Sequence, residues 1–193
     1  YFDLDPSIDV IIDDGRHHIN RTKKTYSLII LDAFLGENPP WHLLTQECFE
    51  TIKRKLDDDG VLIIEFFGLT EGLKGRPARS ILATLQAAGF DVHLIATRKE
   101  DAPDRNLIFL AHKGGFSFEN MRYDQNPYAM EPINDLREYL IEIPSSDMQD
   151  IKILKDDLPV FELMVGRTSL HWRSDLNKLI RDIFVEDDLP LFY

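Results

Sequence analysis

Two acidic residues, Asp14 and Asp32, stand where short apolar runs of the sequence end. Residues 27–31 are too few for a helix and include two β-branched residues, so they predict a strand buried on both faces. Residues 9–13 show the same pattern and predict a second buried strand. Ligands of open α/β sheets bind at the carboxyl ends of parallel strands, where a carboxylate can hold a ligand or accept a proton. The alternative for Asp32 is that it only caps a loop or turn.

Glu65 is expected near the same edge of the sheet as Asp32. It follows four apolar residues in a third predicted strand, residues 61–67. Residues 68–76 contain three glycines and predict a loop. This loop is interpreted either as a lid over the ligand edge or as a plain surface loop.

Helices must link these strands and position their ends. Residues 16–26 predict a short polar helix, and Thr45 is a suitable N-cap for a second helix, which ends in a turn at residues 57–60. Pro77 and Gly89 mark the start and end of a third helix, since proline favours the first turn and glycine the residue after the last.

The second half of the chain begins with two predicted strands, residues 92–96 and 106–111. The polar segment between them is short enough for a hairpin, so we expect them to pair in antiparallel fashion. Beyond residue 113 the pattern becomes irregular, with short helices expected at residues 132–143 and from Ser174, and a short strand at residues 151–154. Asp156 and Asp157 are interpreted as turn formers before Pro159.

Composition narrows the class of protein. The chain has 193 residues, of which 44% are hydrophobic and 29% are charged, as is usual for a globular domain in water. No apolar run approaches the length that crosses a bilayer, so no membrane association is expected. The net charge of −12 argues against a nucleic-acid partner and is compatible with a cationic substrate such as a polyamine, although solubility alone also explains it.

Cys48 is the single cysteine, which excludes an intrachain disulfide. With no secretory signal at the start of the sequence, it predicts a reducing, cytoplasmic location. Cys48 lies in the apolar stripe of the second helix, so we expect a packed core thiol and not a nucleophile. His17 and His18 are adjacent and would face different ways, so no metal site is expected.

Three segments resemble the spermidine synthase family of polyamine aminopropyltransferases, and its divergent bacterial members most. They are Val-Ile-Ile-Asp-Asp-Gly-Arg at residues 10–16, Tyr-Ser-Leu-Ile-Ile-Leu-Asp-Ala-Phe at residues 26–34, and Leu-Asp-Asp-Asp-Gly-Val-Leu at residues 56–62. The second segment is the most specific, since the third occurs in many class I methyltransferase folds. Residues 154–160, Leu-Lys-Asp-Asp-Leu-Pro-Val, also look like a late segment of the divergent members.

The resemblance implies an α/β fold of the Rossmann-like class I S-adenosylmethionine-dependent methyltransferase type in residues 1–113. Residues 114–193 would form a mixed appendage packed on that domain. The glycine-rich cofactor loop of the family would precede residue 1, so the sequence is expected to begin partway through the domain. Residues 9–13 would then lack a neighbouring strand, and we expect missing residues or another chain to fill the gap. Direct pairing of residues 9–13 with residues 27–31 would reject this expectation.

The resemblance also assigns roles to site residues. The family's acid at the position of Asp14 accepts from the adenine amino group of S-adenosylmethionine or its decarboxylated form, and the acid at Asp32 holds and deprotonates the attacking amine. Spermidine synthases proper carry Asp-Ser-Ser-Asp where residues 32–35 here read Asp-Ala-Phe-Leu, and Glu37 is the candidate replacement for the lost second acid. The implied cofactor-binding residues are Asp14, Gly15, Asp32 and Ala33.

Three further residues are candidates for the substrate site: Glu65, Trp41 and His42. The alternative for Trp41 is a core aromatic residue, and for His42 it is simple packing where the second helix begins. The expected partner is a small-molecule amine, and the family's frequent dimers leave a homodimer open.

Three functions follow as alternatives. The first is aminopropyl transfer from decarboxylated S-adenosylmethionine to an amine, with Asp32 as the base. The second is class I methyl transfer from intact S-adenosylmethionine to an unknown acceptor. The third is a non-catalytic member of the fold that acts as an interaction module, which the altered residues 32–35 favour and the two retained acids oppose.

Overall fold

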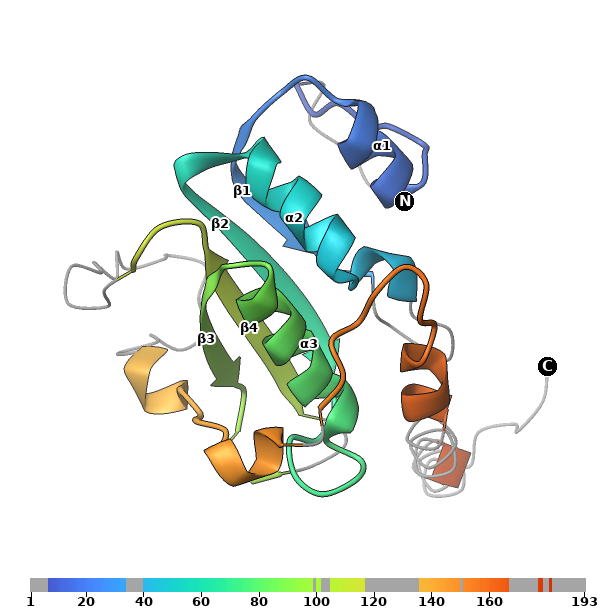
Figure 1. Cartoon of the computed structure of the whole chain (residues 1–193), viewed down its shortest axis with the longest axis vertical. Coiled ribbons are helices and arrows are strands. Elements are labelled where there is room, and N and C mark those ends of the chain that lie inside the picture. The colour runs from blue at the N-terminus through green and yellow to red at the C-terminus, as the bar shows by residue number, and fades with distance from the viewer. Residues whose placement is uncertain are drawn as a thin grey trace.

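The structure is a computed structural model that describes residues 7–33, 40–98, 100–101, 105–116, 136–149, 151–166, 177–178 and 181. Besides a helical stretch at residues 161–166, the described residues form the labelled α-helices and strands and short 3₁₀ helices (Figure 1). In chain order they are α1 Gly15–Arg21, β1 Tyr26–Leu31, the 3₁₀ helix η1 Trp41–Leu43, α2 Gln46–Lys55, β2 Leu56–Phe67, α3 Arg76–Ala87, β3 Asp91–Ala96, β4 Asn106–His112, η3 Leu136–Tyr139 and η4 Ser145–Met148.

The four strands form one mixed sheet in the order β1-β2-β4-β3. Strand β1 runs parallel to β2, with Leu31 opposite Ile64, whereas β4 pairs antiparallel with both β2 and β3. This confirms the predicted antiparallel hairpin and the α/β fold class. Because β1 and β2 are parallel, their carboxyl ends lie at the same edge of the sheet.

Helices α2 and α3 lie side by side over one face of the sheet (Figure 1). Thr45 caps α2 as predicted, because its hydroxyl accepts a hydrogen bond from the backbone N–H of Cys48. Helix α3 carries Pro77 in its first turn, and Gly89 follows its end with a φ of 83°, a left-handed conformation that glycine adopts without strain. The local signals therefore placed both covering helices correctly.

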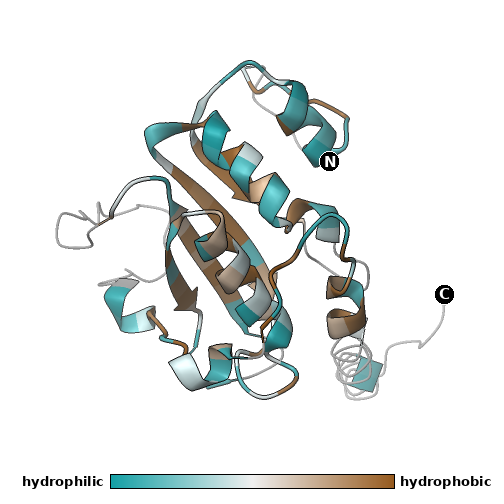
Figure 2. Ribbon diagram, viewed as in Figure 1, coloured by the Kyte–Doolittle hydropathy of each residue, from teal (hydrophilic) through white to brown (hydrophobic). Residues whose placement is uncertain are grey.

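The core lies between the sheet and these two helices. Figure 2 shows the largely apolar strands beneath the two helices. Side chains that the surrounding protein covers completely come from α2, the two central strands and α3, among them Phe49, Ile64, Phe109 and Leu85. Burial of such side chains is the main stabilising term of the fold.

The segment before α1 differs from the prediction. Residues 9–13 form no strand, and their apolar side chains are exposed, with Ile12 99% accessible. They do not pair with β1, which is an edge strand of the sheet among the described residues. Leu28 and Ile30 of β1 are 46% and 57% exposed, so the expected burial of this strand on both faces is also wrong. The physical reason is the same in both cases: in the described part of the chain, nothing covers this side of β1.

Two other predictions are corrected. Residues 57–60 do not form a turn, because β2 begins at Leu56 directly after α2 and the register with β1 shifts between Tyr26 and Leu28. Residues 151–154 form no strand. Instead, the backbone of Leu154 bonds to the helices: its carbonyl accepts from the N–H of Gln46, and its N–H donates to the hydroxyl of Thr84.

The later part of the chain packs against the same core. Leu154, Phe161 and Val165 are buried, and the rings of Phe161 and Phe66 meet edge to face at 6.1 Å. Of the helix expected at residues 132–143, residues 132–135 lie outside the described residues, and among residues 136–143 only η3 is helical. The helix expected from Ser174 falls mostly outside the described residues. The division into residues 1–113 and 114–193 remains a prediction.

An ion-paired cluster holds the loop after β2. The carboxylate of Asp101 accepts from the Arg105 guanidinium at 2.5 Å and from the N–H groups of Thr70 and Glu71 at 2.8 and 3.1 Å. Arg79 donates to the Thr70 carbonyl as well. These contacts fix residues 70–72 and favour the plain surface loop over the lid.

Candidate functional site

Asp14 occupies the N-cap of α1. Its Oδ1 accepts from the backbone N–H of His17 at 2.9 Å, and its Oδ2 lies 3.0 Å from Nε2 of His42. The hydrogen bond from the His17 backbone, followed by that from His42, holds the pKa of the Asp14 carboxyl below its usual value against the opposing effect of desolvation. Asp14 is therefore ionised at neutral pH and fixed in direction by two donors.

Asp32 follows the last residue of β1 and is exposed. Its predecessor Leu31 pairs with Ile64 of β2, and Glu65 follows Ile64 in the parallel neighbour. Asp32 and Glu65 thus come directly after a matched pair of residues on adjacent strands, as the sequence predicted. Glu65 is half-buried, and Ala33 is exposed like Asp32.

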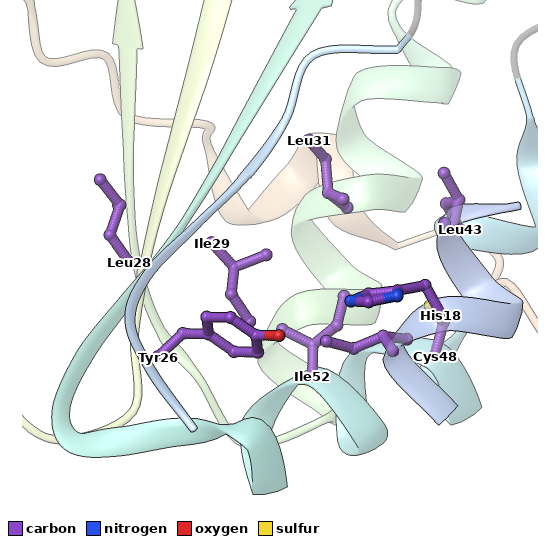
Figure 3. A pocket seen from close by; sticks show the side chains of 10 residues that line it. His18, Tyr26, Leu28, Ile29, Leu31, Leu43, Cys48 and Ile52 are labelled. Atoms are coloured by element: carbon purple, nitrogen blue, oxygen red, sulfur yellow. The ribbon is translucent and has the colours of Figure 1, made fainter. Parts of the chain in front are cut away.

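A cavity of about 260 Å³ lies between α1, β1 and α2 (Figure 3). Gly15 and Leu31 line it, and these residues are the chain neighbours of Asp14 and Asp32. Asp14 and Asp32 themselves are not among the residues that line the cavity. Its wall is mainly apolar, with one imidazole and one phenol ring among the lining side chains: His18, Ile19, Tyr26, Leu28, Ile29, Leu43, Cys48 and Ile52.

Sequence reasoning missed His18 and Tyr26 as lining residues. His18 turns toward the cavity from α1, whereas its neighbour His17 is exposed and bonds to Asp13 at 3.0 Å (Figure 3). Tyr26 reaches the cavity from the start of β1, with its hydroxyl 3.2 Å from that of Thr22. The spacing of apolar residues in α1 did not predict which side chains face the cavity, because a helix of two turns has too few apolar residues to define a buried face.

Arg16 and Asp156 form a second cluster that the sequence did not reveal. The Arg16 guanidinium binds the carboxylate of Asp156 through two hydrogen bonds, 3.0 and 2.7 Å long. The same guanidinium donates to the carbonyl of His42 at 2.6 Å and to the hydroxyl of Thr45 at 2.9 Å. The bonds from Arg16, with a smaller contribution from Thr45, hold the pKa of Asp156 below its usual value. Asp156 is thus more than the turn former that was predicted.

The remaining predicted residues have different surroundings. Trp41 is partly buried in η1 and packs against the core, and His42 is part-exposed beside Asp14. Glu37 lies outside the described residues. Cys48 is fully buried, and this burial raises the pKa of its thiol to about 11, so it is a core thiol as predicted.

Other possible sites are limited. No three histidine, cysteine, aspartate or glutamate side chains gather as metal ligands in the part of the chain that the structure describes. Over the same residues, no helix is long and apolar enough to cross a membrane. A second cavity, of about 520 Å³, is lined by α3, β3 and residues 140–148, and no predicted site residue is in its lining.

Residues 3–95, which include both acids, match the spermine/spermidine synthase domain. The resemblance to the spermidine synthase family is confirmed. The polyamine aminopropyltransferase of Bacillus subtilis is 31% identical over 61 residues, which are 32% of this chain and 22% of that protein. The N-terminal histidine N-methyltransferase of Emericella nidulans is 33% identical over 93 residues, 44% of this chain and 17% of that protein. The chain thus spans about a fifth of the length of these curated relatives.

Solved spermidine synthases share the fold of this chain. The enzyme of Thermotoga maritima superposes with a TM-score of 0.55 at 18% identity, over 75% of this chain and 50% of the other. A spermidine synthase in complex with the transition-state analogue AdoDATO gives a TM-score of 0.53 at 17% identity, again over 75% and 50%. The α/β fold is therefore the methyltransferase-like fold of these synthases, as predicted.

Proposed function

We propose that the protein is a spermidine synthase-like transferase, which moves an aminopropyl group from decarboxylated S-adenosylmethionine to an amine. The observation that carries this proposal is the position of Asp14 and Asp32 within the matched segment, each next to a residue that lines one cavity. The mainly apolar wall of that cavity suits a purine ring, and Asp14 is an ionised acceptor for an adenine amino group.

The reaction needs a neutral amine and a bound sulfonium. The amine nitrogen attacks the methylene carbon next to sulfur, a C–N bond forms, and the electron pair of the breaking C–S bond goes to sulfur. This step releases 5′-methylthioadenosine, and one proton of the attacking nitrogen passes to the Asp32 carboxylate. Because the sulfonium is already a good leaving group, positioning supplies most of the catalysis.

The acceptor amine would bind on the Asp32 side of the site. Glu65 at the same sheet edge, with Trp41 and His42, is proposed for substrate binding, and Glu37 for the role of a second acid. The net charge of −12 favours cationic substrates, and both the decarboxylated donor and an amine acceptor are cations. A cytoplasmic location and a homodimer remain predictions.

Methyl transfer is the second candidate, because part of the chain is also similar to an N-methyltransferase, the Emericella nidulans protein. It would use the same adenine acceptor with intact S-adenosylmethionine, and it needs no diamine site. The absence of the second acid of the Asp-Ser-Ser-Asp pattern in residues 32–35 is compatible with methyl transfer.

A transfer assay with each donor separates these functions. The protein is incubated with putrescine and either decarboxylated or intact S-adenosylmethionine, and products are identified by mass spectrometry. We expect an aminopropyl adduct and 5′-methylthioadenosine with the decarboxylated donor only. A methyl adduct with intact donor would instead establish methyl transfer. If calorimetry detects binding of neither donor, the interaction module is the function that stands.

A further inference from the structure

We propose that Arg16 and Asp156 are positioning residues that orient Asp14 toward the adenine amino group, so that adenosine recognition depends on a segment far along the chain. This inference rests on the proposed function, in which Asp14 accepts from adenine. Hydrogen bonds join Asp156 to Arg16 and Arg16 to the backbone carbonyl of His42, and the ring of His42 contacts Asp14.

Asp156 is held in place from several sides. Its Oδ1 accepts from the hydroxyl of Thr45 at 2.6 Å, and its backbone N–H donates to Oε2 of Glu47 at 3.2 Å. Two residues earlier, buried Leu154 bonds through its backbone to Gln46 and to Thr84. The carboxylate therefore stands at a fixed point beside the start of α2.

The fixed carboxylate in turn fixes Arg16. Two parallel hydrogen bonds to Asp156 set the plane of the guanidinium, a geometry that a lysine ammonium cannot reproduce. The side chain of Arg16 is 17% exposed and that of Asp156 is 45% exposed, so the guanidinium is largely covered while the carboxylate faces water on one side. One Arg16 nitrogen then reaches the His42 carbonyl at 2.6 Å, which holds the turn that presents the His42 ring.

His42 completes the connection to Asp14. Its Nε2 lies 3.0 Å from Oδ2 of Asp14, while Oδ1 receives the N–H of His17. Both carboxylate oxygens are thereby directed, and each keeps a lone pair for a further donor. Arg16 also belongs to α1 itself, two residues after Asp14, so a displaced guanidinium would disturb Asp14 through the helix as well.

Asp157 provides a matched control. It adjoins Asp156 and is exposed, and no hydrogen bond joins its side chain to the residues that the structure describes. Asp156→Asn and Asp157→Asn remove the same charge from neighbouring positions. Only the first removes the charged partner of Arg16.

The test compares two ligands that differ in the group Asp14 would bind. Calorimetry measures the dissociation constants of 5′-methylthioadenosine and 5′-methylthioinosine, in which a carbonyl replaces the adenine amino group. We expect Asp156→Asn and Arg16→Lys to weaken the adenosine compound about tenfold and the inosine compound much less, because misplacement of a positioned group costs recognition of that group. Asp157→Asn should leave both constants unchanged.

A second readout does not depend on a ligand. The NMR signals of the His42 imidazole should move in Asp156→Asn and stay in place in Asp157→Asn, with thermal unfolding confirming that both variants are folded. Unchanged His42 signals together with an unchanged preference for the adenosine compound would overturn the inference. If the unsubstituted protein binds neither compound, the proposed function fails and the adenine role of Asp14 with it, while the His42 signals still decide whether Asp156 positions His42.

Discussion

Replacing Asp32 with asparagine is expected to lower the rate of aminopropyl transfer by about 10²- to 10⁴-fold, the usual contribution of a general base. Asparagine has nearly the same shape but cannot take the proton of the attacking amine. Steady-state rates with the decarboxylated donor and putrescine measure the effect. Because the variant lacks only the base, its rate should recover as the pH rises toward the range where the free amine becomes neutral, near 10.

The control is Asp57→Asn, which removes another exposed acid at the other end of the β1–β2 pair, where Tyr26 lies opposite Leu56. This variant should transfer at the unsubstituted rate. A rate for Asp32→Asn within about twofold of the control would mean that Asp32 is not the base. Asp32 would then only cap the loop or turn after β1, which is the alternative that its position in the sequence left open.

Replacing Asp101 with alanine is expected to lower the free energy of unfolding by about 3–5 kcal/mol, the typical cost of removing one member of a buried ion pair. The side chain of Arg105 is 2% exposed, and Asp101 lies 2.5 Å from it. Asp101 also accepts from Thr70 and Glu71, so its loss frees the loop after β2. Urea denaturation followed by circular dichroism measures the change.

A double variant isolates the cause. In Asp101→Ala with Arg105→Met, the buried charge is gone as well, and an apolar side chain fills most of the space of the guanidinium. We therefore expect the double variant to be more stable than Asp101→Ala alone, since apolar replacement of a buried ion pair is often close to neutral. A loss below about 1 kcal/mol for Asp101→Ala would show that solvent screens this pair.

The sequence predicted elements whose signals are local. The N-cap of α2, the proline and glycine at the ends of α3 and the short apolar runs of β1 to β4 depend on a few adjacent residues, and the structure has all of these elements. The exposure of Leu28 and Ile30 could not be predicted in this way. An apolar run has the same pattern in a central strand and in a terminal strand, and only the arrangement of the sheet decides which side of it is covered.

The site was predictable to a smaller extent. Asp14 and Asp32 were found because each follows an apolar run, and the resemblance of their segments gave them roles. The bond between Arg16 and Asp156 joins residues 140 positions apart, and nothing in the sequence next to either residue indicates that the two should meet. Such a contact depends on how residues 151–166 pack on the helices, which their irregular pattern did not indicate.

The proposed adenosine site beside Asp14 and Asp32 is tested most directly by mapping where an adenosine compound binds. Backbone amide signals of the protein are followed by NMR as 5′-methylthioadenosine is added. Saturable shifts are expected at residues 14–15 and 32–33, on both sides of the cavity between α1 and β1. Saturable shifts confined to the second cavity, between α3, β3 and residues 140–148, would contradict it.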